Sequence, residues 1–386
     1  PMVAMGCKYL RICHLNNCAT GVATQDNVLR SKYYLGEVEG VMNYFRFIAE
    51  DVRNILASLG TKSLTDIIGR TDLLVELEGN TSKQQSLDLT QLISDGGVSP
   101  DKAQYCVEPF NEPFDKGELA EQMVSDALSA IENKTGGEFT YTVQNIHRSI
   151  GARLSGEIAS RHSNLGMEDS PVVLKLTGTA GQSFGVWNAG GLHMYLDGDA
   201  NDYVGKGMAG GKLVIRPPKG SDFASHETTI IGNTCLYGAT GGTLYASGLA
   251  GERFGVRNSG CHTVVEGIGD HGCEYMTGGH VTILGKTGIN FGAAMTGGFA
   301  YIYDENNNFA DCINQDVDIQ RMLPENMEAH RNHLKSVIEN FVKETGSKRG
   351  QYILDNFTDC VGKFWLVKPK ATKLESLMDD LQRRAA

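Results

Sequence analysis

A recurring glycine pattern restricts the fold of this 386-residue sequence more than any other feature. Twenty-nine of its 47 glycines lie between Gly178 and Gly298, and many of them form pairs. Successive pairs, with Gly260-Cys261 filling one place in the series, start 20, 31, 19, 18 and 19 residues apart. Self-similarity at a short, nearly constant period predicts a repeat architecture. The glycine pairs are Gly190-Gly191, Gly210-Gly211, Gly241-Gly242, Gly278-Gly279 and Gly297-Gly298.

The repeat also has a longer period and one insertion. Residues 180–188 return seventy residues later, in similar form, as residues 250–258. The 31-residue step holds an insertion around Pro217-Pro218-Lys219-Gly220. An alternating apolar run such as Val281-Thr282-Ile283-Leu284 follows most glycine pairs. One turn and a few short strands per unit are typical of one coil of a parallel β-helix.

Glycine suits such coils where the chain turns with φ > 0 or where two backbones stack closely. The alternative is that the glycine-rich turns bind phosphate, which requires a single strand–loop–helix unit. Here the pattern recurs six times without an intervening helix. Histidines of the repeat, such as His262 and His280, are expected in turns or on the surface. The sequence therefore predicts an all-β, right-handed parallel β-helix followed by short C-terminal helices.

A second feature is a group of three cysteines near the start of the sequence. Cys7, Cys13 and Cys18 are separated by five and then four residues. On a helix these steps would turn the chain by about 240° and 140°, so the thiols would not share a face. A loop folded around a compact object would gather them. In an acidic chain without an export signal, three converging thiols indicate a metal site rather than a disulfide framework.

Ligand chemistry narrows the type of metal. Structural zinc usually has four ligands with closely spaced pairs, and this segment has no close pair. Cysteine thiolates are the usual ligands of iron–sulfur clusters, and Lys8 and Arg11 would offset the cluster's negative charge. Three ligands favour a three-iron cluster, or a fourth ligand supplied by His14 or Cys106. On spacing alone, zinc and three reduced thiols packed in a core remain alternatives.

Composition limits the classes of partner. The net charge of −11 argues against nucleic acid and against an anionic membrane surface. No apolar run approaches the roughly 18 residues of a membrane span, and no signal peptide is recognisable. Nine cysteines without disulfide-scaffold spacing suit a reducing cytoplasm. Because the sequence begins at Pro1 and continues into an apolar run, we expect a fragment whose N-terminal side is missing.

Apolar spacings of three and four predict helices on both sides of the repeat, and alternation predicts strands. Residues 79–117 are polar and rich in turn residues, so we expect little regular structure there. Arg148, Arg153 and Arg161 are expected on the solvated surface of a helix, with docking onto an acidic neighbouring domain as the alternative. The expected helices cover residues 40–59, 63–69, 118–133, 147–162, 326–345 and 347–357, and the expected strands cover residues 139–143 and 364–369.

The cysteine segment and the glycine repeat coincide in one known family. The segment from Gly6-Cys7 through Cys18-Ala19-Thr20-Gly21-Val22-Ala23-Thr24-Gln25 resembles the iron–sulfur segment of the glutamate synthase large (alpha) subunit. The repeat, with Gly181-Gln182-Ser183-Phe184-Gly185 and Met276-Thr277-Gly278-Gly279, is similar to that family's C-terminal GXGXG domain. Residues 68–74 and 364–370 are also similar to it, so the resemblance covers nearly the whole chain.

The resemblance implies a part of a flavin- and iron-dependent enzyme. Cys7, Cys13 and Cys18 match the three ligands of the family's 3Fe-4S cluster, which passes electrons to FMN. The complete enzyme forms two L-glutamates from L-glutamine and 2-oxoglutarate, using an amidotransferase domain and an FMN-binding TIM-barrel synthase domain. NADPH supplies electrons through a small (beta) subunit that carries FAD, which implies a cytoplasmic hetero-oligomer. The resemblance places no catalytic residue in this chain and implies that the chain is inactive alone, because the amidotransferase domain and most of the FMN site would lie upstream.

The resemblance also divides the chain. Residues 1–78 would be the end of the α/β synthase domain with its iron–sulfur segment, and residues 79–140 a connecting region. Residues 141–314 would be the GXGXG β-helix, and residues 315–386 the C-terminal helices and tail. The alternative function is a non-catalytic β-helix scaffold of another redox complex, similar to formylmethanofuran dehydrogenase. The cysteine segment and residues 40–78 argue against this alternative, because a stand-alone β-helix subunit would not need them.

Overall fold

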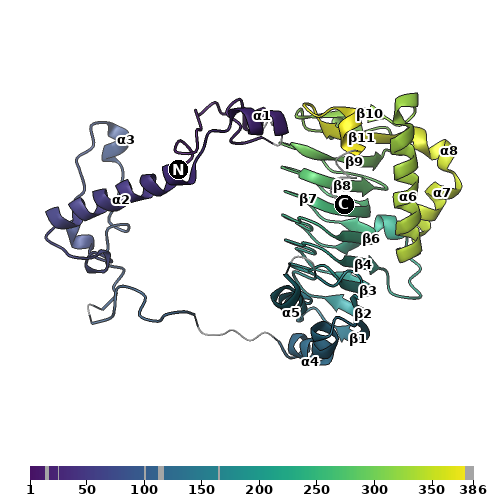
Figure 1. Ribbon diagram of the computed structural model, residues 1–386, viewed down its shortest axis with the longest axis horizontal. Helices are drawn as coiled ribbons and strands as arrows, with labels where there is room; N and C mark the ends of the chain where they lie inside the picture. Colours follow the sequence, from purple (N-terminus) through teal and green to yellow (C-terminus); the bar gives the residue numbers. More distant parts are fainter. Residues whose placement is uncertain (14–16, 25, 100, 112–116, 164–165, 379–386) are drawn as a thin grey trace. The chain divides into compact units, whose positions relative to one another are not determined.

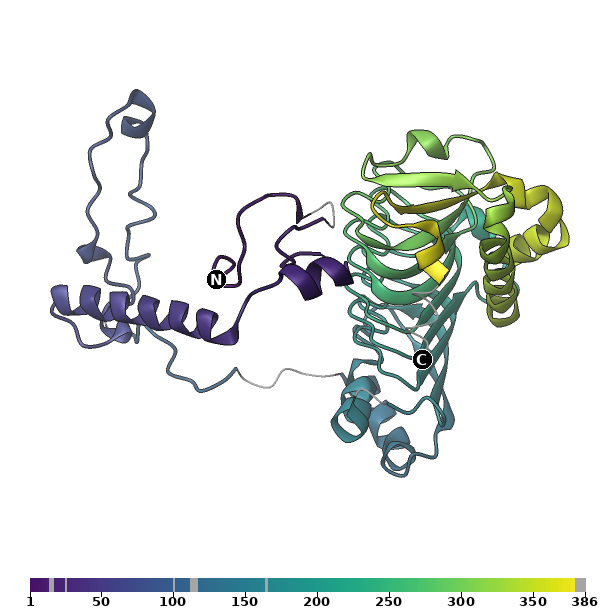
Figure 2. The same ribbon diagram turned by 45° about the horizontal axis from the view of Figure 1, so that its top comes forward.

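The chain folds into two compact units. The computed structural model describes residues 1–13, 17–24, 26–99, 101–111, 117–163 and 166–378. The first unit comprises Pro1–Tyr9 and Tyr34–Asp115, and the second comprises Leu10–Tyr33 and Lys116–Ala386. Figure 1 shows the helices and strands of both units, and Figure 2 shows them from a second direction. Within the described residues, no helix combines the length and the apolar character needed to cross a membrane.

Helix α2, Val38–Ser58, is the longest element of the first unit. It confirms the amphipathic helix expected over residues 40–59, because its apolar residues recur every three or four positions. Leu56 is buried, whereas Phe45 and Phe47 on the same helix are 56% and 71% exposed. The helix expected over residues 63–69 is a single 3₁₀ turn. The remaining elements are the 3₁₀ turns Leu64–Asp66 and Thr71–Leu73 and the short helix α3, Ser82–Gln85.

The second unit is a parallel β-helix. Its strands follow the order β1-β2-β3-β4-β6-β7-β8-β9, each parallel to the next, while β5 pairs with β3 and β6. Figure 1 shows these strands stacked one above another. The fold predicted from the glycine period is therefore confirmed. The strands are β1 (Gly137–Val143), β2 (Val172–Ala180), β3 (Leu192–Ala200), β4 (Lys212–Arg216), β5 (Thr229–Ile231), β6 (Thr243–Ala250), β7 (Ser259–Gly267), β8 (Thr277–Ile283) and β9 (Gly297–Tyr303).

Helices and antiparallel strands cover the stack of coils. Helices α4 and α5 lie near β1 at one end, and β11 pairs antiparallel with both β9 and β10 at the other. Helices α6, α7 and α8 lie along one side (Figure 1). Such caps are needed because a bare solenoid end exposes its core and its strand edge. The bounds are α4 (Glu118–Glu132), α5 (Ala152–His162), β10 (Val317–Arg321), α6 (Glu328–Thr345), α7 (Lys348–Asp355), α8 (Phe357–Cys360) and β11 (Phe364–Pro369).

Two hydrophobic clusters hold this unit together. Inward side chains of the coils, such as Leu176 and Leu196, form the first cluster inside the β-helix. Outward side chains of β7 and β9, such as Tyr301, form the second cluster with Leu334 and Phe341 of α6. Burying one large apolar side chain contributes about 1.5–3 kcal/mol. Helix α6 is therefore held against the coils chiefly by its apolar face.

Hydrogen bonds also join the corners of successive coils. The N–H of Tyr203 donates to the carbonyl of Asn233 at 2.9 Å, and the N–H of Arg253 donates to that of Asp270 at 2.8 Å. Tyr203 and Arg253 both have positive φ, +64° and +59°. The sequence led us to expect glycine at such corners, because other residues lose about 1–2 kcal/mol in this conformation. Hydrogen bonds to the next coil hold them there nevertheless.

The glycine pairs fulfil both roles expected of them. Gly279, the second glycine of its pair, has φ +78°, and a Cβ at this position would overlap the carbonyl of Cys261. Asn258 is fully buried nearby, and its Nδ2 donates to the same carbonyl at 3.0 Å. Asn188, its counterpart in the seventy-residue period, is buried to the same extent. The longer period therefore repeats a buried side chain as well as a backbone turn.

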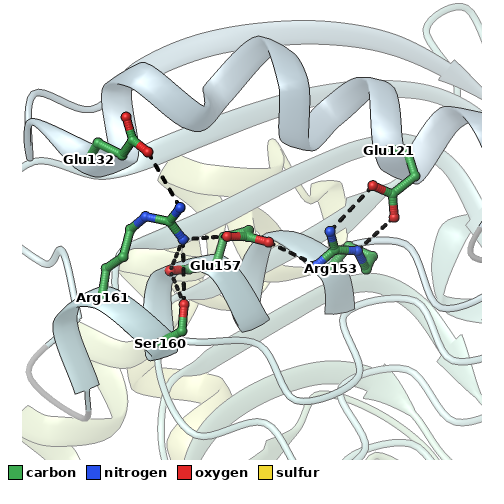
Figure 3. Close-up of polar contacts among 6 residues, drawn as sticks. All are labelled: Glu121, Glu132, Arg153, Glu157, Ser160 and Arg161. Carbon is green, nitrogen blue, oxygen red and sulfur yellow. Dashed lines mark hydrogen bonds and ion pairs between the residues drawn. The ribbon is translucent and has the colours of Figure 1, made fainter.

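Ion pairs join α4 to α5 at the β1 end (Figure 3). Arg153 Nε lies 2.7 Å from Glu121 of α4, and Arg161 Nη2 lies 3.4 Å from Glu132 of the same helix. Both arginines also pair with Glu157. Although burial opposes the shift, hydrogen bonds from Arg153 and Arg161 hold the pKa of Glu157 below its usual value. These two arginines therefore face α4 rather than open solvent.

Candidate metal centre

Cys7 follows a tight turn at the start of the first unit. The N–H of Gly6 donates to the carbonyl of Val3 at 2.9 Å, and the N–H of Cys7 donates to that of Met2 at 3.0 Å. Gly6 has φ +94°, which a glycine adopts without steric cost. The half-buried Sγ of Cys7 accepts a hydrogen bond from the N–H of Tyr9 at 3.4 Å. Hydrogen bonds of this kind stabilise a metal-bound thiolate.

Cys18 lies in a turn-rich segment of the second unit that leads to helix α1, Asn27–Tyr33. Its side chain is buried, and its Sγ lies 3.2 Å from Thr20 Oγ1. The hydrogen bond with the Thr20 side chain, followed by one from the backbone of Ala23, lowers the pKa of Cys18 to about 7 despite the opposing effect of burial. A thiol with this pKa is substantially ionised near neutral pH, and the thiolate is the form that binds metal.

The buried cysteines of the β-helix show the opposite electrostatics. Burial raises the pKa of Cys235 and of Cys261 to about 12, and it raises the pKa of Cys273 further. These three thiols stay neutral and pack in the core of the coils. Burial therefore cannot be the cause of the low pKa of Cys18, because it acts in the opposite direction. The hydrogen bonds from Thr20 and Ala23 in its own loop lower this pKa.

The structure gives the other candidate ligands less support than it gives Cys7 and Cys18. Cys13 is exposed, and Cys106 is exposed in the first unit, where its thiol donates to the carbonyl of Glu108 at 3.0 Å. His14 lies outside the described residues. Over the parts of the chain that are described, no three His, Cys, Asp or Glu side chains are placed to hold a metal ion. The three-thiol site stays a prediction, and the donors around Cys18 and Cys7 fit the thiolates that an iron–sulfur cluster requires.

Within the second unit, the part of the cysteine segment at Asn17 lies beside the last coils of the β-helix. Asn17 lines a cavity of about 490 Å³ together with Met295 and Gln315. Asp316 and Lys370, which flank β10 and β11, line the same cavity. The end of the solenoid that carries the antiparallel cap therefore also supports the segment around Cys18.

A cluster of histidines under α6 was not foreseen from the sequence. His262 on β7 and His280 on β8 were expected in turns or on the surface, but their Nδ1 atoms lie 2.5 Å apart beneath α6, and His280 is buried. Tyr301 Oη lies 2.9 Å from His330 Nδ1 and 3.1 Å from His333 Nδ1. Burial lowers the pKa of His280 and lowers that of His333 to about 4. His280 and His333 are therefore neutral at pH 7.

Comparison with known proteins places these features in one family. Residues 1–62 match the family model described as a conserved region in glutamate synthase, and residues 118–370 match the model of the GXGXG motif. Ferredoxin-dependent glutamate synthase 2 of Synechocystis is 48% identical over 96% of this chain. The chain belongs to the glutamate synthase family. All three cysteines of the candidate site lie inside the first matched region.

Glutamate synthases with different named electron donors match to a similar extent. The NADPH glutamate synthase large chain of Bacillus subtilis is 40% identical over 97% of this chain, and the NADH glutamate synthase of Schizosaccharomyces pombe is 42% identical over 97%. The matched parts make up 24% of the Synechocystis and Bacillus subtilis proteins and 18% of the Schizosaccharomyces pombe protein. The chain therefore spans about a quarter or less of the length of these glutamate synthases.

Proposed function

We propose that this chain is the C-terminal part of a glutamate synthase large subunit and that Cys7, Cys13 and Cys18 ligate a 3Fe-4S cluster. The observation that carries the proposal is the match to the glutamate synthase conserved region over residues 1–62, which contains all three cysteines. The low pKa of Cys18 supports it, because the loop already favours the thiolate. When bound, the cluster would pass electrons one at a time toward FMN.

The chain's own residues would bind and orient that cluster. The hydrogen bonds to Cys18 from Thr20 and Ala23, and from Tyr9 to Cys7, stabilise negative charge on sulfur. Lys8 and Arg11 supply positive charge within the same segment. The β-helix contributes stiffness, since its coils are joined by hydrogen bonds through both strands and corners.

The complete enzyme would form two L-glutamates from L-glutamine and 2-oxoglutarate. Its amidotransferase domain and most of its FMN site would lie outside this chain, which would not be active alone. We propose NADPH as the electron donor, delivered through a small (beta) subunit with FAD in a cytoplasmic hetero-oligomer. The name of the Bacillus subtilis relative, an NADPH glutamate synthase large chain, supports this choice. The names of other relatives specify ferredoxin or NADH.

We propose that residues 1–78 form the end of the TIM-barrel synthase domain. The exposed apolar residues of α2 support this assignment, because a helix taken from a larger domain would leave such a face uncovered. Residues 79–140 would connect it to the β-helix of residues 141–314 and the C-terminal helices of residues 315–386. The end of the connecting region, from Glu118 onward, packs in the same unit as the β-helix.

Serine substitutions in the complete enzyme test the ligand assignment. Cys7→Ser, Cys13→Ser and Cys18→Ser should each remove iron and acid-labile sulfide, together with an EPR signal that is present in the oxidised enzyme and lost on reduction. NADPH-driven glutamate formation should be abolished, while glutaminase activity largely persists. Cys312→Ser is the matched control and should change none of these properties, because this thiol is partly exposed in the β-helix unit. Unchanged NADPH-dependent turnover in the three variants would contradict the proposal.

Two further variants distinguish a three-iron cluster from one with a fourth protein ligand. With three ligands, Cys106→Ser and His14→Ala should both retain the full iron content. Loss of iron in either variant would assign the fourth ligand and exclude the three-ligand site. Zinc, or no metal in a well-folded anaerobic preparation, would favour the non-catalytic scaffold instead.

A further inference from the structure

The insertion in the glycine period forms one wall of a cavity. Pro217, Pro218 and Lys219 line a space of about 970 Å³ in the second unit, and the α6–α7 junction at Gly346 and Lys348 lines it from the other side. A stack of regular coils would leave no such hollow. The single long step of 31 residues in the series therefore coincides with a pocket of the size that small ligands occupy.

Positive charge dominates the wall of this cavity, in a chain whose net charge is −11. Arg216 and Arg349 are already paired, with Asp197 and Glu305 respectively. Lys219 and Lys348 have no ion pair within the described residues. These two ammonium groups are therefore available to an anion. The charged residues that line the cavity are Arg216, Lys219, Lys348 and Arg349, with Asp222 and Glu305.

Arg349 is held rigidly in the cavity wall. Only 8% of the residue is exposed, and its Nε donates to the carbonyl of Leu284 at 3.0 Å. Its Nη2 lies 2.6 Å from Glu305, and its guanidinium lies 5.0 Å from the centre of the Tyr303 ring. Arg349, Glu305 and His226 also line an adjoining cavity of about 450 Å³. Because its Nε and Nη2 are already bonded, Arg349 fixes the shape of the cavity wall and leaves anion contacts to the two lysines.

The start of α7 adds to the preference for an anion. Ser347 Oγ accepts a hydrogen bond from the N–H of Gly350 at 2.9 Å and donates one to the buried Glu266 at 2.5 Å. This anchor places Lys348 and Arg349 in the first turn of α7, where backbone N–H groups have no acceptor within the helix. The positive end of the helix dipole lies at the same place.

Aromatic rings line the cavity beside these cations. Phe223 is 44% exposed and Tyr352 is 51% exposed, so both rings are accessible to a ligand in the cavity that they line. We propose that this cavity binds a nucleoside phosphate, with its phosphates at Lys219 and Lys348 and its base against Phe223 or Tyr352. An aromatic ring can stack on any base, because every base has a π-face. The proposal does not depend on the iron–sulfur site.

Equilibrium dialysis of the complete enzyme with ADP tests this site by stoichiometry. The wild type should bind one ADP more per large subunit than the variant Lys219→Glu/Lys348→Glu, or bind it at least tenfold more tightly. Arg349 is left intact, because its loss would remove the bond to Leu284. Lys343→Glu is the matched control on α6: its side chain is exposed and does not line the cavity, so binding should match the wild type. Equal ADP binding by wild type and double variant would overturn the proposal.

Two further probes separate the halves of the ligand. Adenosine should fail to occupy the site, and pyrophosphate should bind at least tenfold more weakly than ADP, because it lacks a ring to contact Phe223 or Tyr352. Pyrophosphate binding as tight as that of ADP would overturn the nucleoside assignment. Adenosine binding as tight as that of ADP would overturn the role of the cations.

Discussion

The two compact units differ in how many of their large apolar side chains are buried. In the first unit, Leu56 is the one large apolar side chain that is buried among the described residues, and Phe47 and Leu77 are 71% and 85% exposed. The second unit contains both hydrophobic clusters. A solenoid closes its own core coil by coil. Helix α2 instead needs a further apolar surface, which agrees with a chain that spans a quarter or less of the length of its relatives.

The largest effect should appear when the units are separated. Residues 116–386 expressed alone should unfold cooperatively on heating and show a β-rich circular dichroism spectrum, because they contain the sheet and both hydrophobic clusters. Residues 34–115 alone should show no cooperative transition, because too little apolar surface is buried. Cooperative unfolding of residues 34–115 would break the comparison.

Within the β-helix, close packing can be separated from backbone conformation. Gly279→Ala should lower the free energy of unfolding by about 3 kcal/mol, because the added Cβ meets a backbone carbonyl in addition to the unfavourable φ. Gly238→Ala is the matched control: φ is +64° and no atom lies within 4 Å of the added Cβ, so the expected cost is about 1 kcal/mol. Urea unfolding measures both. Equal losses would show that the coils can shift apart.

Acid should destabilise the second unit selectively, since residues 34–115 contain no histidine. The pKa of His280 and of His333 is lower in the folded state than in the unfolded state, so the unfolded state binds more protons as the pH falls. Stability should therefore be complete above pH 6.5 and fall between pH 6.5 and about 4. His333, with a pKa of about 4, would account for up to about 3 kcal/mol of this loss.

Urea unfolding across that pH range checks the histidine prediction. His333→Phe should reduce the pH dependence, because a phenyl ring cannot take up a proton. His226→Asn is the control outside the cluster and should leave the dependence unchanged. If His333→Phe leaves the pH dependence of the free energy of unfolding unaltered, His333 is not the group that takes up the proton.

The smallest effect should come from ion pairs. A double-mutant cycle on Arg153 and Glu121, which join α4 to α5, should give a coupling of at most about 1 kcal/mol, because both side chains are partly exposed. The pair of Arg70 and Asp72 in the first unit is more exposed and should give no measurable coupling. A coupling energy at Arg70 and Asp72 larger than that at Arg153 and Glu121 would contradict the expected order of the two units.

Local patterns were sufficient for most of the elements. Apolar spacing predicted α2, α4 and α6 within a few residues, because such spacing determines which helix face can be buried. The helix expected from residue 147 begins only at Ala152, since Gly151 adopts a left-handed conformation with φ +97°. The positive φ values of residues such as Tyr203 could not be predicted, because their acceptors belong to the next coil.

The candidate sites likewise include features that the sequence predicted and features that it did not. The three cysteines were identifiable because thiolate chemistry and spacing are local properties of a short segment. The pKa of about 7 at Cys18 depends on how its loop folds back onto the sulfur. The histidine cluster was missed because it combines β7 and β8 with two turns of a helix that lies fifty residues further along the chain.

The sequence by itself determined the β-helix, because a glycine period of about 19 residues permits close stacking of coils and excludes long helices from the repeat. It also determined that three thiols lie close together along the chain. Only the tertiary structure decided where α6 and α7 pack. Ser347 reaches Glu266 across 81 residues, and Arg349 reaches Leu284 across 65. Such contacts depend on which surfaces meet once the coils have formed, and the charged cavity at Lys348 exists because of them.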